Sequence, residues 1–296
     1  MTAIPMTAMI GRAWRTPFGS TVDGVIARLR AGERCERTAP IRELPRGSRH
    51  ARYLRRMGLF GIEVASEALA ASGIAGGPRV GLFAGVGGLR VHWDDMLGAT
   101  EHQDDSGERI WERGMRQVHP YWMLRHLSNN VHALASVDLA LKGEGATFGG
   151  GNAGAQAIAS ASRALADDAV DAALVVAYDS LLEPETLVEL DARGELARGF
   201  VPGEAAAAIV LVRAPDPRTI ARIAVFDGAA LEHAPFAARD GGERADWVQP
   251  MGQLGAATTV VQAIALAAGL APPSHDSALG LHRAEPGLFA AIRVTG

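Results

Sequence analysis

The sequence predicts a layered α/β fold, and two observations carry that prediction. Short, almost wholly apolar segments such as Val80–Ala84 and Ala172–Ala177 have the length and composition of buried parallel strands. Between such segments, apolar residues recur every three or four positions, as in 53–71, which is typical of an amphipathic helix. Strands that alternate with helices indicate a mostly parallel sheet covered by helices.

The expected elements follow one another along the whole chain. They are a strand at 8–10, a turn at 15–19, a helix at 22–29 ending at Gly32, a surface loop at 34–49, a helix at 53–71 ending at Gly73, a strand at 80–84, an exposed polar insertion at 94–109, a helix entered within 119–130 and running through Leu139, a strand at 147–148, a helix at 153–166, strands at 172–177, 207–212 and 223–226, a helix at 260–268 and a strand at 290–294.

Composition and charge exclude several classes of function. The 296 residues are 48% hydrophobic and 21% charged, as in an ordinary globular protein, and the net charge of -4 provides no basic surface for nucleic acid. Cys35 is the only cysteine, so an intrachain disulfide or a Cys/His zinc cluster is not expected. The chain shows no signal peptide and no apolar run of membrane-spanning length, so we expect a cytoplasmic protein that binds neither nucleic acid nor membrane.

Five segments, in the right order, resemble β-ketoacyl synthases. They are Gly81–Gly88, Ala135–Thr147, Asn152–Ile158, Gly199–Ala206 and Gly255–Ala268 with the following Pro272-Pro273. The likeness is specific over about 9–215 and patchy afterwards. It implies a thiolase-like α-β-α-β-α fold, with a ketosynthase-like N-terminal half at 1–215 and a shortened C-terminal half at 216–296 in one compact unit.

The resemblance also implies that the catalytic residues are missing. A ketosynthase needs a thiolate to carry the acyl chain, and Asn152 stands at the position of that cysteine. The two family histidines come from His-Gly-Thr and Gly-His segments, and the chain contains neither dipeptide. Gln253, or Gly252 with a one-residue gap, stands near the position of the second histidine, and the first has no counterpart. The lysine that precedes the second histidine in the family is absent as well.

Two interpretations of Asn152 follow. A side-chain amide does not ionise near neutral pH, so it cannot act as the nucleophile, but its oxygen can accept a hydrogen bond from the first turn of the helix that follows. The sequence therefore predicts a helix-capping residue at a retired site. The alternative is an amide that polarises a substrate carbonyl.

Other candidate sites are weaker. Gly85–Gly88 lacks the spacing of a dinucleotide-binding loop, and Ser160 and Ser162 lack the Gly-x-Ser-x-Gly elbow of a hydrolase. Spacings of seven and six residues put His119, His126 and His132 on no common helical face, so no metal site is expected. The acidic cluster of Asp104, Asp105 and Glu108 is expected to be a solvated loop, and Glu204 to be structural.

An assembly role fits two features. The early turns of the helix at 153–166 are built of small residues, which permit close backbone approach. Aromatic and methionine side chains are enriched over 111–123, as in interface cores. The residues that the resemblance places at a dimer contact or acyl tunnel are Trp111, Met115, Tyr121, Trp122, Met123 and Phe148, with packing in an ordinary core as the alternative.

The resemblance implies a chain-length-factor-like subunit of a type II polyketide or aryl-polyene ketosynthase. Such a subunit has no catalytic residues and needs no cofactor or metal. Its partners would be an active, Cys-containing ketosynthase and, through that enzyme, an acyl carrier protein. The alternatives are a decarboxylase of malonyl-carrier protein, in which an amide replaces the cysteine, and a homodimeric scaffold.

Overall fold

The computed structural model describes residues 6–87, 95, 114, 116, 118–227, 244–245, 247–270, 277–285 and 288–295. Its strands are β1 (Thr7–Arg15), β2 (Val80–Val86), β3 (Ala146–Gly149), β4 (Ala172–Ser180), β5 (Glu204–Arg213), β6 (Ala221–Asp227), β7 (Arg244–Ala245), β8 (Ser277–Glu285) and β9 (Leu288–Thr295). Its helices are α1 (Val22–Arg30), α2 (Arg56–Ser72), α5 (Trp122–Arg125), α6 (Asn130–Asp138), α7 (Ala153–Ala166), α8 (Pro184–Ala192) and α10 (Thr258–Ala267), with 3-10 turns at Gln249–Met251 and Gly255–Ala257.

The described strands form one sheet in the order β3-β2-β4-β5-β1-β6-β9-β8-β7. Parallel pairing joins β2 to β3 and to β4, and also β7 to β8, whereas β5 runs antiparallel between β4 and β1. The sheet is therefore mixed, and the expectation of a mostly parallel sheet was wrong. The register pairs Val80 with Ala172 and Val86 with Tyr178, so the carboxyl ends of β2 and β4 lie side by side.

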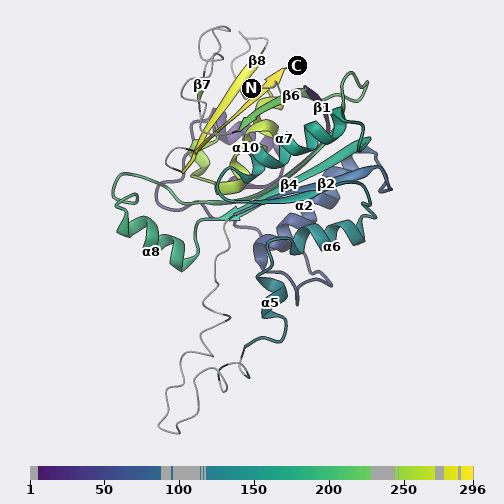
Figure 1. Ribbon diagram of the computed structural model, residues 1–296. Helices are drawn as coiled ribbons and strands as arrows, with labels where there is room; N and C mark the ends of the chain where they lie inside the picture. The colour runs from purple at the N-terminus through teal and green to yellow at the C-terminus, as the bar shows by residue number, and fades with distance from the viewer. Residues whose placement is uncertain are drawn as a thin grey trace.

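The elements stack in layers, as the predicted thiolase-like fold requires (Figure 1). Helices α2 and α6 cover one face of β2, β4 and β5, where Phe60, Val64 and Val131 are fully buried. Helices α7 and α10 lie on the opposite face, between these strands and the strands of the second half, which contribute Ile223 and Ile292 to the same core. The layered α/β fold predicted from the sequence is confirmed.

The second half is thinner than the first. Its strands β6, β9 and β8 continue the sheet through the antiparallel pairing of β1 with β6 at Thr7–Met9. Helices α7 and α10 pack on its inner side, and none of the described helices packs on its other side (Figure 1). The described residues thus provide four of the five expected layers. None of the described helices is long and apolar enough to cross a membrane.

Several predicted elements are found where the sequence placed them. Helix α7 has the predicted bounds, and α2 ends at Gly73, whose φ of 68° is the left-handed conformation that closes many helices. Helix α8 and strands β7 and β8 were not predicted. The insertion expected at 94–109 lies outside the described residues, apart from Asp95.

The helix expected to run through Leu139 is in fact two helices, α5 and α6. Asn130 explains the break, because its side-chain amide donates to the carbonyl oxygens of Leu124 (3.3 Å) and Arg125 (3.2 Å). Its Oδ1 accepts from the backbone N–H of Val131 at 2.7 Å. One side chain therefore bonds the last carbonyls of α5 and the N–H of the second residue of α6, and this local bonding competes with a continuous helix.

Candidate functional site

The ends of β2 and β4 meet the start of α7 and the segment 249–257, and we call the contact of Asn152–Gly154 with Gly255–Ala257 the elbow. The elbow is built on close backbone approaches. A methyl group on Gly154 would lie 2.3 Å from the carbonyl oxygen of Ala256, and one on Gly85 would lie 2.7 Å from the backbone of Ala153. Glycine at both positions lets helix α7 sit directly on the strand end and on the facing turn. Gly85 therefore allows α7 to pack closely against the end of β2.

Asn152 lies at the first position of the elbow, immediately before α7, and is 4% exposed. Its side chain caps no backbone N–H of the helix, so the predicted capping role was wrong. Its Oδ1 instead accepts a hydrogen bond from the Nε2 of Gln156 at 3.0 Å, one turn further along. Asn152 is therefore a buried amide bonded to another amide.

The segment with Gln253 makes its backbone contacts with the residues just before β5. The N–H of Gln253 donates to the carbonyl of Val201 at 2.8 Å, and the N–H of Gly203 donates to the carbonyl of Gln253 at 2.9 Å. These bonds join 199–204 to 249–257, two of the segments singled out in the sequence. Further on, the N–H of Ala256 donates to Asp179 Oδ2 at 3.0 Å, so that carboxylate connects the end of β4 to the elbow.

Glu204 is the centre of a buried network beside the elbow. This carboxylate, 3% exposed, accepts from the N–H of Ile41 at 2.8 Å, from Arg56 Nη1 at 2.6 Å and from Ser180 Oγ at 3.1 Å. Arg56 also donates to the carbonyl of Ile41. The glutamate therefore ties the loop before α2, the first residue of α2 and the end of β4 together, a structural role.

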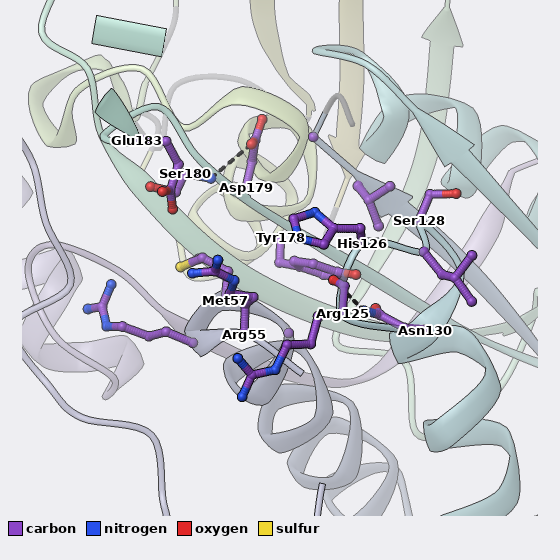
Figure 2. Close-up of a pocket in the computed structure, with 15 residues that line it drawn as sticks. Arg55, Met57, Arg125, His126, Ser128, Asn130, Tyr178, Asp179, Ser180 and Glu183 are labelled. Carbon is purple, nitrogen blue, oxygen red and sulfur yellow. Dashed lines mark hydrogen bonds between the residues drawn. The ribbon is translucent and has the colours of Figure 1, made fainter. Parts of the chain in front are cut away.

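A pocket of about 200 Å³ opens on the α2 side of the same strand ends (Figure 2). We call it the α2 pocket. Its walls come from the start of α2, from the ends of β2 and β4 and from the α5–α6 connection, and they combine guanidinium, hydroxyl, carboxylate and apolar groups. The lining residues are Arg55, Arg56, Met57, Gly58, Val86, Gly87, Arg125, His126, Leu127, Ser128, Asn130, Tyr178, Asp179, Ser180 and Glu183.

Asp95 holds one wall of the α2 pocket in place. Its carboxylate lies 2.8 Å from Arg55 Nη2, 3.3 Å from Arg125 Nη1 and 3.4 Å from His126 Nε2. The Asp95 side chain is only 10% exposed, so these contacts are shielded from solvent. One carboxylate thus fixes α2 and the α5–α6 connection relative to each other.

Burial changes the ionisation of two groups near these sites. It raises the pKa of Tyr178, with a smaller contribution from the neighbouring charge of Asp179, so the phenol stays protonated at neutral pH. Burial also lowers the pKa of His132, although a backbone hydrogen bond at Ala146 opposes that shift. His132 contacts the hydroxyl of Thr147 through Nδ1 at 3.1 Å, on the strand that precedes the elbow.

The structure places the predicted tunnel or interface residues in two groups. Tyr121 lies just before α5 and is 36% exposed, and Met123 lies on α5 and is 66% exposed. The ring of Trp122 contacts that of His126 at a centroid distance of 5.6 Å. Phe148 is apart from them, on β3, where it packs partly buried against the core under α7. Trp111 and Met115 lie outside the described residues, and the other four do not line the α2 pocket.

The remaining candidates from the sequence are dispersed. His119 accepts the N–H of Tyr121, His126 contacts Asp95 and His132 contacts Thr147. Within the described part of the chain, no group of three or more His, Cys, Asp or Glu side chains is arranged to hold a metal ion. Ser162 is buried inside α7, and the acidic cluster at 104–108 lies outside the described residues.

The residues of the α2 pocket were missed in the sequence. Arg55-Arg56 at a helix start and Tyr178-Asp179-Ser180 at a strand end were the available signals, since charged residues at element ends can face a site. Nothing in the sequence relates them to Asp95 or Arg125, because the sheet order that brings them together is not encoded in any local pattern.

Comparison with known proteins supports one family. The model of the β-ketoacyl synthase N-terminal domain matches residues 42–216, more than half of the 296 residues. A search of curated proteins found no significant match.

Solved structures with the same fold cover nearly the whole chain. One is described as a type II PKS acyl-carrier protein in complex with its ketosynthase bound to the hexaketide (AntDE:AntF); it has a TM-score of 0.81 and 14% identity, with 99% of each chain covered. A β-ketoacyl synthase from Burkholderia phymatum has a TM-score of 0.75 and 15% identity, and the ishigamide ketosynthase/chain length factor has 0.72 and 16%; each comparison covers 98% of this chain and 99% of the other.

At these identities the structures establish the fold, and the match over 42–216 establishes the relationship. The chain belongs to the β-ketoacyl synthase family.

Proposed function

We propose that this chain is the non-catalytic, chain-length-factor-like partner of an active ketosynthase in carrier-protein-dependent chain elongation. The observation that supports the proposal is the elbow, where Asn152, the residue that the resemblance assigns to the position of the family's cysteine, is bonded to Gln156. Condensation requires a thiolate nucleophile and groups that stabilise the developing negative charge. An amide cannot supply the first, and the facing segment 249–257 contains no histidine to help with the second.

Two surfaces support assembly with a second polypeptide. Strand β3 is at one end of the described sheet and pairs only with β2, which leaves its other edge available. Around α5, the exposed apolar side chains of Met123, Leu124 and Leu127 are 66%, 43% and 48% exposed. Exposed apolar groups gathered on one short segment are typical of a protein interface. The partner ketosynthase would supply the cysteine and histidines, and a carrier protein would deliver the acyl chain to it.

The test is co-expression with a Cys-containing ketosynthase, followed by affinity purification and analysis of the products. We expect a stable complex that elongates a carrier-bound chain. Met123→Glu and Leu127→Glu should weaken the complex at least tenfold, which corresponds to about 1.4 kcal/mol, because each places a charge in an apolar contact. Val188→Glu is the matched control, since Val188 is an apolar residue 69% exposed on α8.

The same purified chain distinguishes the alternatives. Incubation with malonyl-carrier protein alone should release no carbon dioxide. Carbon dioxide release by the isolated chain would overturn the proposal in favour of a decarboxylase. Failure to bind any ketosynthase, together with self-association through α5, would favour a homodimeric scaffold.

A further inference from the structure

Strand β1 carries two buried hydrogen-bond donors on one of its faces. The register pairs Arg12 with Ile209 and Trp14 with Ala207, and both partners belong to the core under α7 and α10. Residues opposite each other in an antiparallel pair share a face of the sheet, so Arg12 and Trp14 lie together on that side. Arg12 Nη1 and Trp14 Nε1 are both buried, and neither has a hydrogen-bond partner in the described part of the chain.

Donors in this situation are costly to the folded state. A buried N–H without an acceptor has lost its bonds to water and gained nothing in return, and the cost is larger when the group is charged. Burial lowers the pKa of Arg12, and the charge of Asp23 on α1 opposes that shift only in part. The described residues therefore leave the guanidinium short of negative charge.

The two donors can be reached from the surface and can share one small acceptor. Arg12 is partly exposed, whereas Trp14 is fully buried beside Val25 and Ile26 of α1. Residues two apart in a strand are separated by about 7 Å, and two donors that each lie about 3 Å from one acceptor can be about 6 Å apart. A single ion between α1 and β1 therefore suffices for both.

We infer that β1 and α1 enclose a binding site for a monovalent anion of the size of chloride, which accepts hydrogen bonds from Arg12 Nη1 and Trp14 Nε1. One negative charge matches the one guanidinium. A phosphate dianion fits less well, because the cost of removing an ion from water rises with the square of its charge. Strand β1 pairs with β5 of the first half and β6 of the second, so the ion stabilises the strand that joins them.

The first experiment measures urea denaturation of the full-length chain in chloride and in gluconate at equal ionic strength. Gluconate is also monovalent, but it is too bulky for a buried site. One or two charge-assisted hydrogen bonds correspond to a dissociation constant of about 10 mM, so about 100 mM chloride should raise the folding equilibrium constant roughly tenfold.

Variants of the two donors assign this effect to the site. Arg12→Met should abolish the chloride effect, because it removes the charge and the donor but keeps an unbranched side chain. Trp14→Phe should weaken chloride binding about fivefold through the loss of one donor. Arg28→Met is the matched control on α1, since Arg28 already donates to the carbonyl of Phe18 at 3.1 Å and to Glu33 Oε2 at 2.7 Å. It should keep the tenfold effect.

A second measurement locates the ion without relying on variants that fold poorly. Crystals of the wild-type chain soaked in bromide should show an anomalous peak within hydrogen-bond distance of both donors. Bromide at other positions only, or a chloride effect that survives Arg12→Met, would overturn the inference. A wild-type chain indifferent to chloride would also overturn it, and would leave Asp23 as the counter-charge of Arg12. The proposed function does not depend on any of these results.

Discussion

The elbow and the α2 pocket lie at the ends of the same two strands, yet they are built in opposite ways. At the elbow, backbone meets backbone, and Asn152 is 4% exposed with its amide already bonded to Gln156. In the α2 pocket, about 200 Å³ remains open and the hydroxyl of Tyr178 has no bond within the described structure. Asp179 lies between the two regions. It lines the pocket, and its carboxylate accepts a hydrogen bond from the N–H of Ala256 at the elbow.

This difference bears on the proposed function. At the elbow, glycine stands where α7 approaches the strand end and the facing turn, and the side chain of Asn152 cannot ionise near neutral pH. The α2 pocket instead leaves space and polar groups that a ligand could contact. A subunit that shaped a chain without making bonds, as proposed above, would need the second property and not the first.

The largest expected effect is that of Glu204→Ala, which tests the buried network on the pocket side of the strand ends. Removing this carboxylate leaves Arg56, the N–H of Ile41 and the hydroxyl of Ser180 without their shared partner. Loss of one partner of a buried charge pair costs about 3 kcal/mol where the other charge keeps some access to water, as Arg56 does. The free energy of unfolding, measured by urea denaturation, should fall by that amount.

Glu189→Ala provides the comparison, because Glu189 pairs with Arg193 on the exposed surface of α8. Surface pairs of this kind contribute about 0.5 kcal/mol. Similar losses for the two variants would mean that Glu204 does not hold the loop before α2, the start of α2 and the end of β4 together.

A smaller effect tests whether the elbow is as tightly packed as its contacts indicate. Gly154→Ala favours the helix by roughly 1 kcal/mol. It also drives a methyl group to within 2.3 Å of the carbonyl oxygen of Ala256. Overpacking of up to about 3 kcal/mol should prevail, for a net loss of about 2 kcal/mol in urea denaturation. Gly149→Ala, where a methyl group meets nothing within 4 Å, should leave stability nearly unchanged; an equal loss there would show that the elbow is not specially constrained.

The sequence predicted much of the first half of the fold, because its elements carry strong local patterns. Helix α7 is a run of small residues that follows a glycine turn, and α2 ends at a glycine that takes a left-handed conformation. Helix α8 was missed because little of it is buried: Thr186 is its only buried residue, so it has no clear apolar face. Strand β8 was missed in a region where the sequence shows no apolar run.

The candidate site was less predictable for a different reason. The position of Asn152 could be identified from the glycine-rich turn before it, but the partner of its side chain could not, since Asn can bond either backbone or a side chain one turn away. The α2 pocket joins residues from 55 to 183, and Asp95 contacts Arg55 and Arg125, both of them distant in the sequence. Such contacts depend on sheet order and on the break between α5 and α6, which Asn130 determines.

The final prediction is that Asn152→Cys gains neither acylation nor condensation activity. The substitution, made in a Cys35→Ser background so that one thiol is present, restores the family's nucleophile type at the start of α7. A helix N-terminus favours a thiolate, but the position is 4% exposed and no histidine stands in the facing segment 249–257. Mass spectrometry after incubation with an acyl carrier protein substrate should therefore show no acyl adduct, and product analysis no condensation. Asn129→Cys, an exposed site, confirms with a thiol-alkylating reagent that an accessible cysteine reacts under the same conditions. Turnover by the Asn152→Cys protein alone would mean that the elbow needs only a thiol to work, and the chain would then have to be regarded as an enzyme that lost one residue rather than as a subunit adapted to pairing.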